Sequence, residues 1–132
     1  SVGSAAGDYS VGSAAGDYSV GSAAGDSSVG SAAGDYSVGS AAGDYSVGSA
    51  AGYCSVGSAA GNYCRAEATG SASIAAANGY KSKARGATGD YLVLTEYDDA
   101  KNFLWAKMAK VDGSQIKPNV WYTLKDGEFV EA

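Results

Sequence analysis

The chain of 132 residues contains no histidine, and it has one proline, one methionine and two cysteines. Histidine is the commonest general base in enzymes, so its absence removes the usual proton carrier of an active site. No run of 18 apolar residues is present, which argues against a membrane-spanning helix. Residues 1–63 carry five aspartates and no lysine or arginine, a charge that repels nucleic acid and anionic lipid. We therefore expect no enzymatic activity, no nucleic-acid partner and no membrane insertion.

Residues 1–63 consist of seven consecutive copies of the nonamer Ser-Val-Gly-Ser-Ala-Ala-Gly-Asp-Tyr, which differ only in their last two positions. Glycines continue at the same spacing at positions 70 and 79, and they return at position 89 after one inserted residue. The stretches 61–69, 70–78 and 79–88 are therefore interpreted as degenerate copies. We predict a repeat region over residues 1–88, perfect over 1–63 and degenerate over 64–88.

The repeats favour an all-β solenoid over a flexible Gly/Ser linker. Valine returns at a strict period, an aromatic residue follows nearly every unit, and the degenerate copies keep glycine and small residues. We expect the valine and the two alanines of each unit to form the core, where their burial contributes about 3–4 kcal/mol. Ordering nine residues costs on the order of 1–2 kcal/mol each. A single unit is therefore unstable, and the sequence predicts association with further copies.

The number of units in one coil is open at this point. Nine extended residues reach about 30 Å, which is too short to close round a core. Two units can make an 18-residue coil, a flat β-roll whose sheets approach closely because their inner faces carry only alanine, glycine and serine. Alternatively, three chains wrap one axis as an intertwined β-helix in which each unit supplies a third of a turn, or three narrow solenoids associate.

The degenerate copies carry a resemblance that favours the trimeric arrangements. Residues 70–75 read Gly-Ser-Ala-Ser-Ile-Ala, and residues 79–86 read Gly-Tyr-Lys-Ser-Lys-Ala-Arg-Gly. This Gly-x-x-Ser-x-Ala pattern resembles the head repeats of trimeric autotransporter adhesins and related phage fibre repeats, although the unit here is shorter. The resemblance implies a left-handed β-roll that trimerises.

Residues 89–132 have ordinary globular composition and are predicted to form a small antiparallel β-meander. Alternating apolar residues indicate strands at 91–97, 103–111, 120–124 and 128–131, with turns at Asp112-Gly113 and Asp126-Gly127. The segment 111–130 resembles an uncharacterised C-terminal domain that follows Ala/Ser/Gly-rich repeats in phage and gut-bacterial proteins. That resemblance brings no activity. We expect this region to cap the exposed strand edges of the solenoid, with Trp121 and Tyr122 in its core, and to nucleate the rod or set its oligomeric state.

Residues at one repeat position form ladders when units stack. We predict an assembly ladder with the following members: Val2, Val11, Val20, Val29, Val38, Val47, Val56, Tyr9, Tyr18, Tyr36, Tyr45 and Tyr63. The tyrosines are expected to pack between chains or to stack on glycans.

Two further sets of residues are weighed as sites. Cys54 and Cys64 lie ten residues apart, and they either form a disulfide across adjacent rungs or remain two small buried thiols. The repeat aspartates are weak candidates for calcium, with solvated turn residues as the default: Asp8, Asp17, Asp26, Asp35 and Asp44. No other cofactor is expected.

Together these observations predict a structural, self-assembling fibre or filament protein that is extracellular, on a cell surface or associated with a virion. The repeats would form its rod, and the C-terminal region would cap or nucleate it. The alternative is a trimeric adhesin or phage-fibre binding module that recognises a surface glycan or receptor. We expect the chain to be a mature product or a fragment of a longer array.

Overall fold

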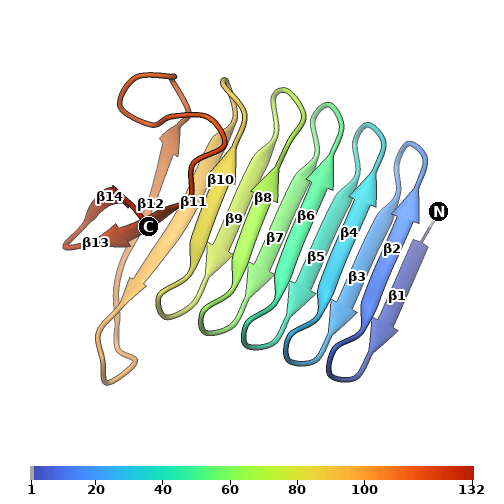
Figure 1. Ribbon diagram of the computed structural model, residues 1–132, viewed down its shortest axis with the longest axis horizontal. Coiled ribbons are helices and arrows are strands. Elements are labelled where there is room, and N and C mark those ends of the chain that lie inside the picture. Colours follow the sequence, from blue (N-terminus) through green and yellow to red (C-terminus); the bar gives the residue numbers. More distant parts are fainter. Residues whose placement is uncertain (1) are drawn as a thin grey trace.

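A computed structural model describes residues 2–132, which form fourteen β-strands and no helix. The strands make two seven-stranded sheets that face each other as a flat, two-layered roll (Figure 1). Sheet A contains, in spatial order, β1 (Val2–Ala6), β3 (Val20–Ala24), β5 (Val38–Ala42), β7 (Val56–Ala60), β9 (Ile74–Asn78), β11 (Tyr91–Tyr97) and β12 (Phe103–Lys110). Sheet B contains β14 (Glu128–Glu131), β13 (Tyr122–Lys125), β10 (Lys83–Gly86), β8 (Arg65–Ala68), β6 (Val47–Ala51), β4 (Val29–Ala33) and β2 (Val11–Ala15). The predicted all-β solenoid with antiparallel strands at its C-terminal end is confirmed.

Each nonamer supplies one strand and one turn, so two nonamers complete one coil. Strands of alternate repeats pair in parallel and in register, so that Val20 lies opposite Val38 and Val38 lies opposite Val56. The intertwined arrangement with a third of a turn per unit is therefore wrong for this chain. One chain closes the coil by itself, because each turn reverses its direction and sends it into the opposite sheet.

The turn between strands depends on two left-handed backbone positions in each repeat. In the third repeat Gly25 has φ of 125° and Ser27 has φ of 57°. The turn backbone also pairs from coil to coil, since the Gly25 N–H donates to the carbonyl of Ala42 and the Ser27 N–H to that of Asp44. The hydrogen-bonded ladder therefore continues round the edges of the roll, which satisfies backbone groups that a loop would leave to water.

The inner face of the perfect repeats consists of glycine and alanine, which agrees with the small inner residues expected for the flat β-roll, whereas the expectation of buried valines is wrong. In β5 the side chains of Val38, Ser40 and Ala42 point outward, whereas Gly39 and Ala41 are buried between the sheets. Period-two alternation fixes this division. The sheets approach so closely that a Cβ at Gly39 would overlap the carbonyl oxygen of Ser49 in the facing sheet. Only the smallest side chains fit, so valine occupies the outer face.

The interior becomes larger toward the C-terminal end. The glycine position is taken by Ala75 in β9 and by Leu92 in β11, which pair in register. Leu94 occupies the neighbouring alanine position in β11, and both leucines are fully buried. The strand β11 therefore completes the last coil of the solenoid and begins a second, larger core.

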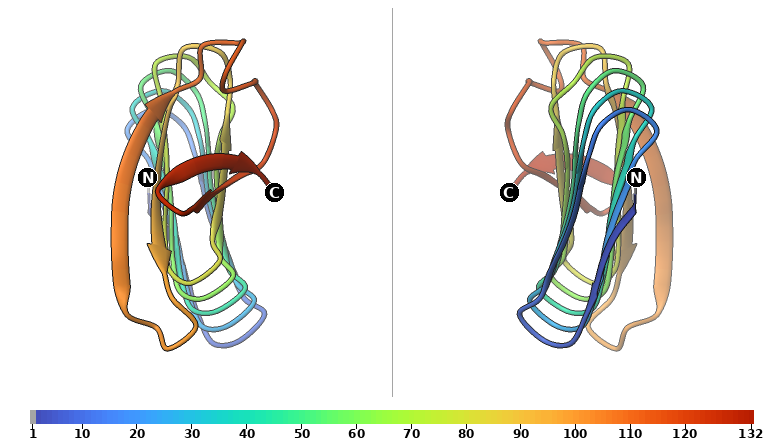
Figure 2. Two further views of the ribbon diagram at one scale, coloured as in Figure 1. Left: turned by 90° about the vertical axis from the view of Figure 1, so that its left-hand side faces the viewer. Right: turned by 90° about the vertical axis from the view of Figure 1, so that its right-hand side faces the viewer.

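The C-terminal strands form two antiparallel hairpins in different sheets rather than one four-stranded meander. Strand β12 extends sheet A beside β11, and the β13–β14 hairpin joins sheet B through a bridge between Tyr122 and Ala84. Figure 2 shows this hairpin lying across the end of the roll. The core there combines the two leucines of β11 with further buried side chains: Val111, Ile116, Tyr122 and Leu124.

Candidate functional site: outer columns, edges and capped end

The predicted valine ladder is divided into two columns, one on each outer face of the roll. Val2, Val20, Val38 and Val56 stand on sheet A, where Ile74 and Tyr91 continue the column. Val11, Val29 and Val47 stand on sheet B, where Arg65 and Lys83 follow them. Each outer face therefore carries a column of apolar side chains along the perfect repeats. Near the cap the column on sheet B continues with basic residues, whereas the column on sheet A does not.

The tyrosines likewise form two ladders, because successive turns lie on opposite edges. On one edge Tyr18 stacks on Tyr36 with ring centroids 5.3 Å apart. On the other edge Tyr45 stacks on Tyr63 at 5.1 Å, and Tyr63 meets Tyr80 edge to face. The rings contact rings of the same chain one coil away, while most of them stay substantially exposed.

The second ladder contains a gap. Ser27 stands between Tyr9 and Tyr45 on that edge, one coil from each. Tyr9 therefore has no ring one coil away to stack on, and the residue is 82% exposed.

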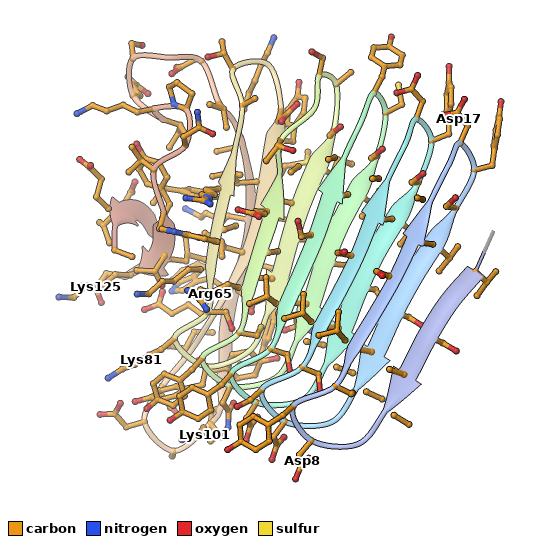
Figure 3. The ribbon with its side chains drawn as sticks, turned by 45° about the vertical axis from the view of Figure 1, so that its right-hand side comes forward. Asp8, Asp17, Arg65, Lys81, Lys101 and Lys125 are labelled. Carbon is orange, nitrogen blue, oxygen red and sulfur yellow. The ribbon has the colours of Figure 1, made fainter. Side chains whose placement is uncertain are left out.

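The aspartates have a structural role in the turns. The Asp8 carboxylate accepts the backbone N–H of Asp26, and the Asp26 carboxylate accepts that of Asp44, both at 3.0 Å. On the opposite edge the Asp17 carboxylate accepts the backbone N–H of Asp35, and the Asp35 carboxylate accepts that of Tyr53. Figure 3 shows Asp8 and Asp17 projecting from opposite edges. These hydrogen bonds to ionised acceptors offset the repulsion between carboxylates in successive coils.

A search of residues 2–132 finds no group of three or more histidine, cysteine, aspartate or glutamate residues arranged to hold a metal ion. Within the same residues no helix could span a membrane.

A second polar ladder, buried inside the edges, was missed by the sequence reasoning. From the third repeat onward the first serine of each perfect copy is buried, and the serine hydroxyl accepts the N–H of the equivalent serine one coil earlier, as Ser73 does for Ser55 at 3.0 Å. The same hydroxyl donates to a glycine carbonyl, in this case that of Gly52. The available signal was that this serine is invariant in all seven perfect copies. Each edge is therefore joined from coil to coil by side chains as well as by backbone.

Asp90 ends this ladder at the capped end. Its buried carboxylate accepts the N–H groups of Ser73 and Ala87, both at 2.9 Å, in the place where earlier coils have a serine hydroxyl. Burial raises the pKa of Asp90, and the two N–H donors act against that rise. A carboxylate provides two acceptors where a hydroxyl offers one donor and weaker acceptors, so Asp90 suits a position where two donors meet.

Of the two alternatives for the cysteines, the structure has free thiols rather than a disulfide, with Cys64 buried and Cys54 half-buried. Cys54 follows β6 and Cys64 follows β7, so their turns lie on opposite edges of the roll. A separation of one repeat is half a coil, which places the thiols on different sides. Cys64 is buried in the serine ladder, 3.2 Å from the Ser82 hydroxyl, and burial raises the pKa of its thiol.

Both sheets hold the capping hairpin. The turn of β13–β14 donates the N–H groups of Asp126 and Gly127 to the two carboxylate oxygens of Glu96 in sheet A, each at 2.9 Å. At the sheet B side the Thr123 hydroxyl donates to the Ser82 carbonyl at 2.9 Å. The hairpin therefore bridges the two layers and covers the end between them.

An ionic cluster fixes the cap to the outer face of sheet B. Arg85 pairs with Glu67 at 2.6 Å, and its guanidinium lies 4.5 Å from the ring centre of Trp121. Trp121 is half-buried at this surface, while Tyr122 is fully part of the core.

A cleft of about 700 Å³ opens at the capped end between β11, β12 and the hairpin. Its lining includes Tyr80, Tyr97, Leu104 and Lys125. The Tyr80 hydroxyl donates to Asp99 at 2.6 Å, and this hydrogen bond raises the pKa of Tyr80. The cleft combines aromatic, aliphatic and charged groups, the mixture typical of sites for small polar ligands.

Comparison of the chain with protein-family models, with curated proteins and with solved structures finds no match. The resemblance to autotransporter heads and phage fibres is thus supported only at the level of a β-solenoid with an 18-residue coil.

Proposed function

We propose that the protein is a structural rod that self-assembles into a fibre or filament, and that it is not an enzyme. The observation that carries this proposal is the in-register stacking of the coils, which repeats the same valine, serine and alanine columns on two flat outer faces. Identical rungs give a regular surface but no place where unlike catalytic groups meet. The C-terminal hairpins act as the cap of the rod.

The apolar columns, whose valines are exposed near the N-terminal end and half-buried farther along, give the rods a way to associate side by side. Ala24 and Ala42 are exposed beside the column that contains Val20 and Val38. Flat faces with small side chains can pack closely against each other and exclude water. Such packing supplies the burial that a single coil lacks, and it suits an extracellular, cell-surface or virion-associated fibre.

Electron microscopy and light scattering over a range of concentrations test this function. The wild type should form regular, concentration-dependent polymers. The variant Val20→Lys/Val38→Lys should stop lateral assembly, because four charges would meet where two faces pack. The matched control Tyr9→Lys/Tyr45→Lys adds the same charge to an edge and should leave polymers intact. A wild type that remains a single particle at every concentration would overturn the proposal.

The cleft at the capped end favours a second candidate, a fibre-tip module that binds a glycan. Tyr80 and Tyr97 supply aromatic surfaces, and the neighbouring lysines and carboxylates supply hydrogen-bonding groups. Binding of immobilised glycans that is lost in Tyr97→Ala and retained in Tyr18→Ala would support this candidate. Equal binding by both variants would contradict it.

A further inference from the structure

Strand β12 is the edge strand of sheet A at the capped end, and β1 is the edge strand at the other end. The eight residues of β12 pair with β11 on one side, and no strand lies on its other side in the described residues. It is also longer than any other strand. A long unpaired edge readily pairs with another chain, and proteins that remain monomeric usually shorten such an edge or protect it with charge.

Six of the eight residues of β12 are apolar, and apolar side chains are exposed on both faces of the strand. Phe103 is 57% exposed, Trp105 is 49% exposed and Met108 is 63% exposed. Met108 lies opposite Val93 on the outer face of the sheet, whereas Trp105 lies opposite Glu96 on the face toward the hairpin. Figure 2 shows β12 at the outer side of the capped end, beside the β13–β14 hairpin. Both faces would lose apolar exposure if the sheet continued past this strand.

We propose that β12 pairs antiparallel with β12 of a second copy, about a twofold axis perpendicular to the sheet. The two rods are then joined through their capped ends by one continuous sheet. The inference rests on the proposed self-assembly and specifies the contact and partner by which the cap sets the oligomeric state. A second copy fits because an antiparallel edge is complementary to itself under twofold symmetry.

The charges on β12 select one register. Residues opposite each other in a sheet share a face, so a twofold axis must pass beside one residue of each copy. An axis at Lys107 would place two ammonium groups opposite each other, which is unfavourable. An axis at Ala106 places Trp105 opposite Lys107 of the second copy, twice in each dimer, and gives two cation–π contacts. Within one chain the Lys107 ammonium already lies 5.7 Å from the Trp105 ring centre.

The proposed interface is small, and its size sets the expected affinity of the dimer. One eight-residue edge buries less than the roughly 800 Å² per partner of a standard stable interface. We therefore expect dimerisation with a dissociation constant on the order of micromolar, visible as a monomer–dimer equilibrium.

Analytical ultracentrifugation of the intact chain tests the contact. Ala106→Lys should weaken dimerisation at least about tenfold, because two new ammonium groups meet on the axis. Tyr9→Lys is the charge-matched control, since Tyr9 is exposed in the turn after β1, at the opposite end of the roll from β12, and should leave the dimer unchanged. Circular dichroism establishes that both variants are folded. Equal dimerisation by both variants would overturn the proposal.

Cysteine cross-linking tests the register. In a Cys54→Ser/Cys64→Ser background, Ala106→Cys brings two thiols together on the axis and should give a covalent dimer under mild oxidation. Met108→Cys places its thiols several residues apart and should give little. Comparable cross-linking of the two variants would contradict the register.

The outcomes separate this inference from the proposed function. If the wild type forms polymers, and Ala106→Lys changes neither their shape nor the amount of dimer, the fibre proposal stands and the β12 contact is overturned. A wild type that is monomeric at all concentrations would overturn both.

Discussion

The perfect repeats and the capped end belong to the same two sheets but are held together in different ways. Between β1 and β7 the interior contains only glycine and alanine side chains, and backbone and serine hydrogen bonds join every coil to the next. At β11 the interior contains leucine, and the hairpins add further large apolar residues. The roll thus depends mainly on backbone pairing and close approach, whereas the cap depends on burial of apolar area.

Removing a large side chain from the cap should have the largest effect on stability. Leu94→Ala deletes a fully buried side chain and should lower the free energy of unfolding by about 2–5 kcal/mol. Urea denaturation followed by tryptophan fluorescence measures this loss, because both tryptophans lie in the C-terminal region. Ala41→Gly in the roll removes one methyl group and serves as the comparison. An equal loss in both variants would mean that the two regions do not differ in their dependence on burial.

Adding one carbon to the interior of the roll should lower the stability of the fold nearly as much. Gly39→Ala places a Cβ against the Ser49 carbonyl, and the resulting overpacking should cost about 1–3 kcal/mol. Thermal unfolding followed by circular dichroism measures the loss. The control is Ala75→Gly, at the equivalent position of β9 where alanine fits. Unchanged stability of Gly39→Ala would contradict the close approach of the sheets.

Asp90, at the boundary between the two regions, should make the free energy of unfolding depend on pH. Asp90→Asn replaces one of two acceptors by a donor, so a buried N–H of Ser73 or Ala87 loses its partner at a cost of about 1–3 kcal/mol. Burial raises the folded-state pKa of Asp90, so the folded state binds its proton more tightly than the unfolded state. Protonation of Asp90 therefore contributes fully to the free energy of unfolding below the unfolded-state pKa. This contribution is lost as the pH rises through the folded-state pKa.

Urea denaturation of both proteins from pH 3 to pH 7 follows that contribution. The stability difference between wild type and Asp90→Asn should decrease as pH rises. The pKa values of Asp98 and Asp112 are lowered by hydrogen bonds from backbone N–H groups. Their effects have the opposite sign and cancel, because both proteins contain them. A difference that is independent of pH would refute the role given to Asp90.

Repairing the tyrosine ladder should have the smallest effect, and it should be stabilising. Ser27→Tyr fills the gap between Tyr9 and Tyr45 with a ring at the spacing seen elsewhere on the edges. Two new stacked pairs should add about 0.5–1.5 kcal/mol. Differential scanning calorimetry measures the gain, with Ser27→Leu as a control of similar bulk without an aromatic ring. No difference between the two variants would show that ring stacking adds nothing to the edges.

The nine-residue period allowed the solenoid to be predicted from the sequence, and alternating apolar residues between turn dipeptides allowed the C-terminal strands to be predicted. Strands β11 and β14 have the bounds that were predicted, and β12 differs by one residue. The number of repeats in a coil could not be decided, because nine residues can close in more than one way. The deciding feature is the distance between the sheets, which depends on Gly39 and its equivalents facing inward.

The errors about side chains have the same origin. Valine was placed in the core because it is the most hydrophobic residue of the repeat, yet two layers in contact leave no room for it. The disulfide alternative for Cys54 and Cys64 assumed that one repeat is one coil. With half a coil per repeat, they fall on opposite edges. The buried serine ladder was missed because no role was assigned to the serines of the repeat.

Half a coil per repeat also determines how such a rod can change its length. Every perfect copy fits either sheet, since the two outer faces and the two edges present the same residues in the same order. One added or lost copy changes the array by half a coil, so the N-terminal end lies on the other sheet and the cap is unaltered. Two added or lost copies change the axial length by about 4.8 Å. The rod can therefore be lengthened or shortened by simple duplication or deletion, without any compensating substitution elsewhere in the chain.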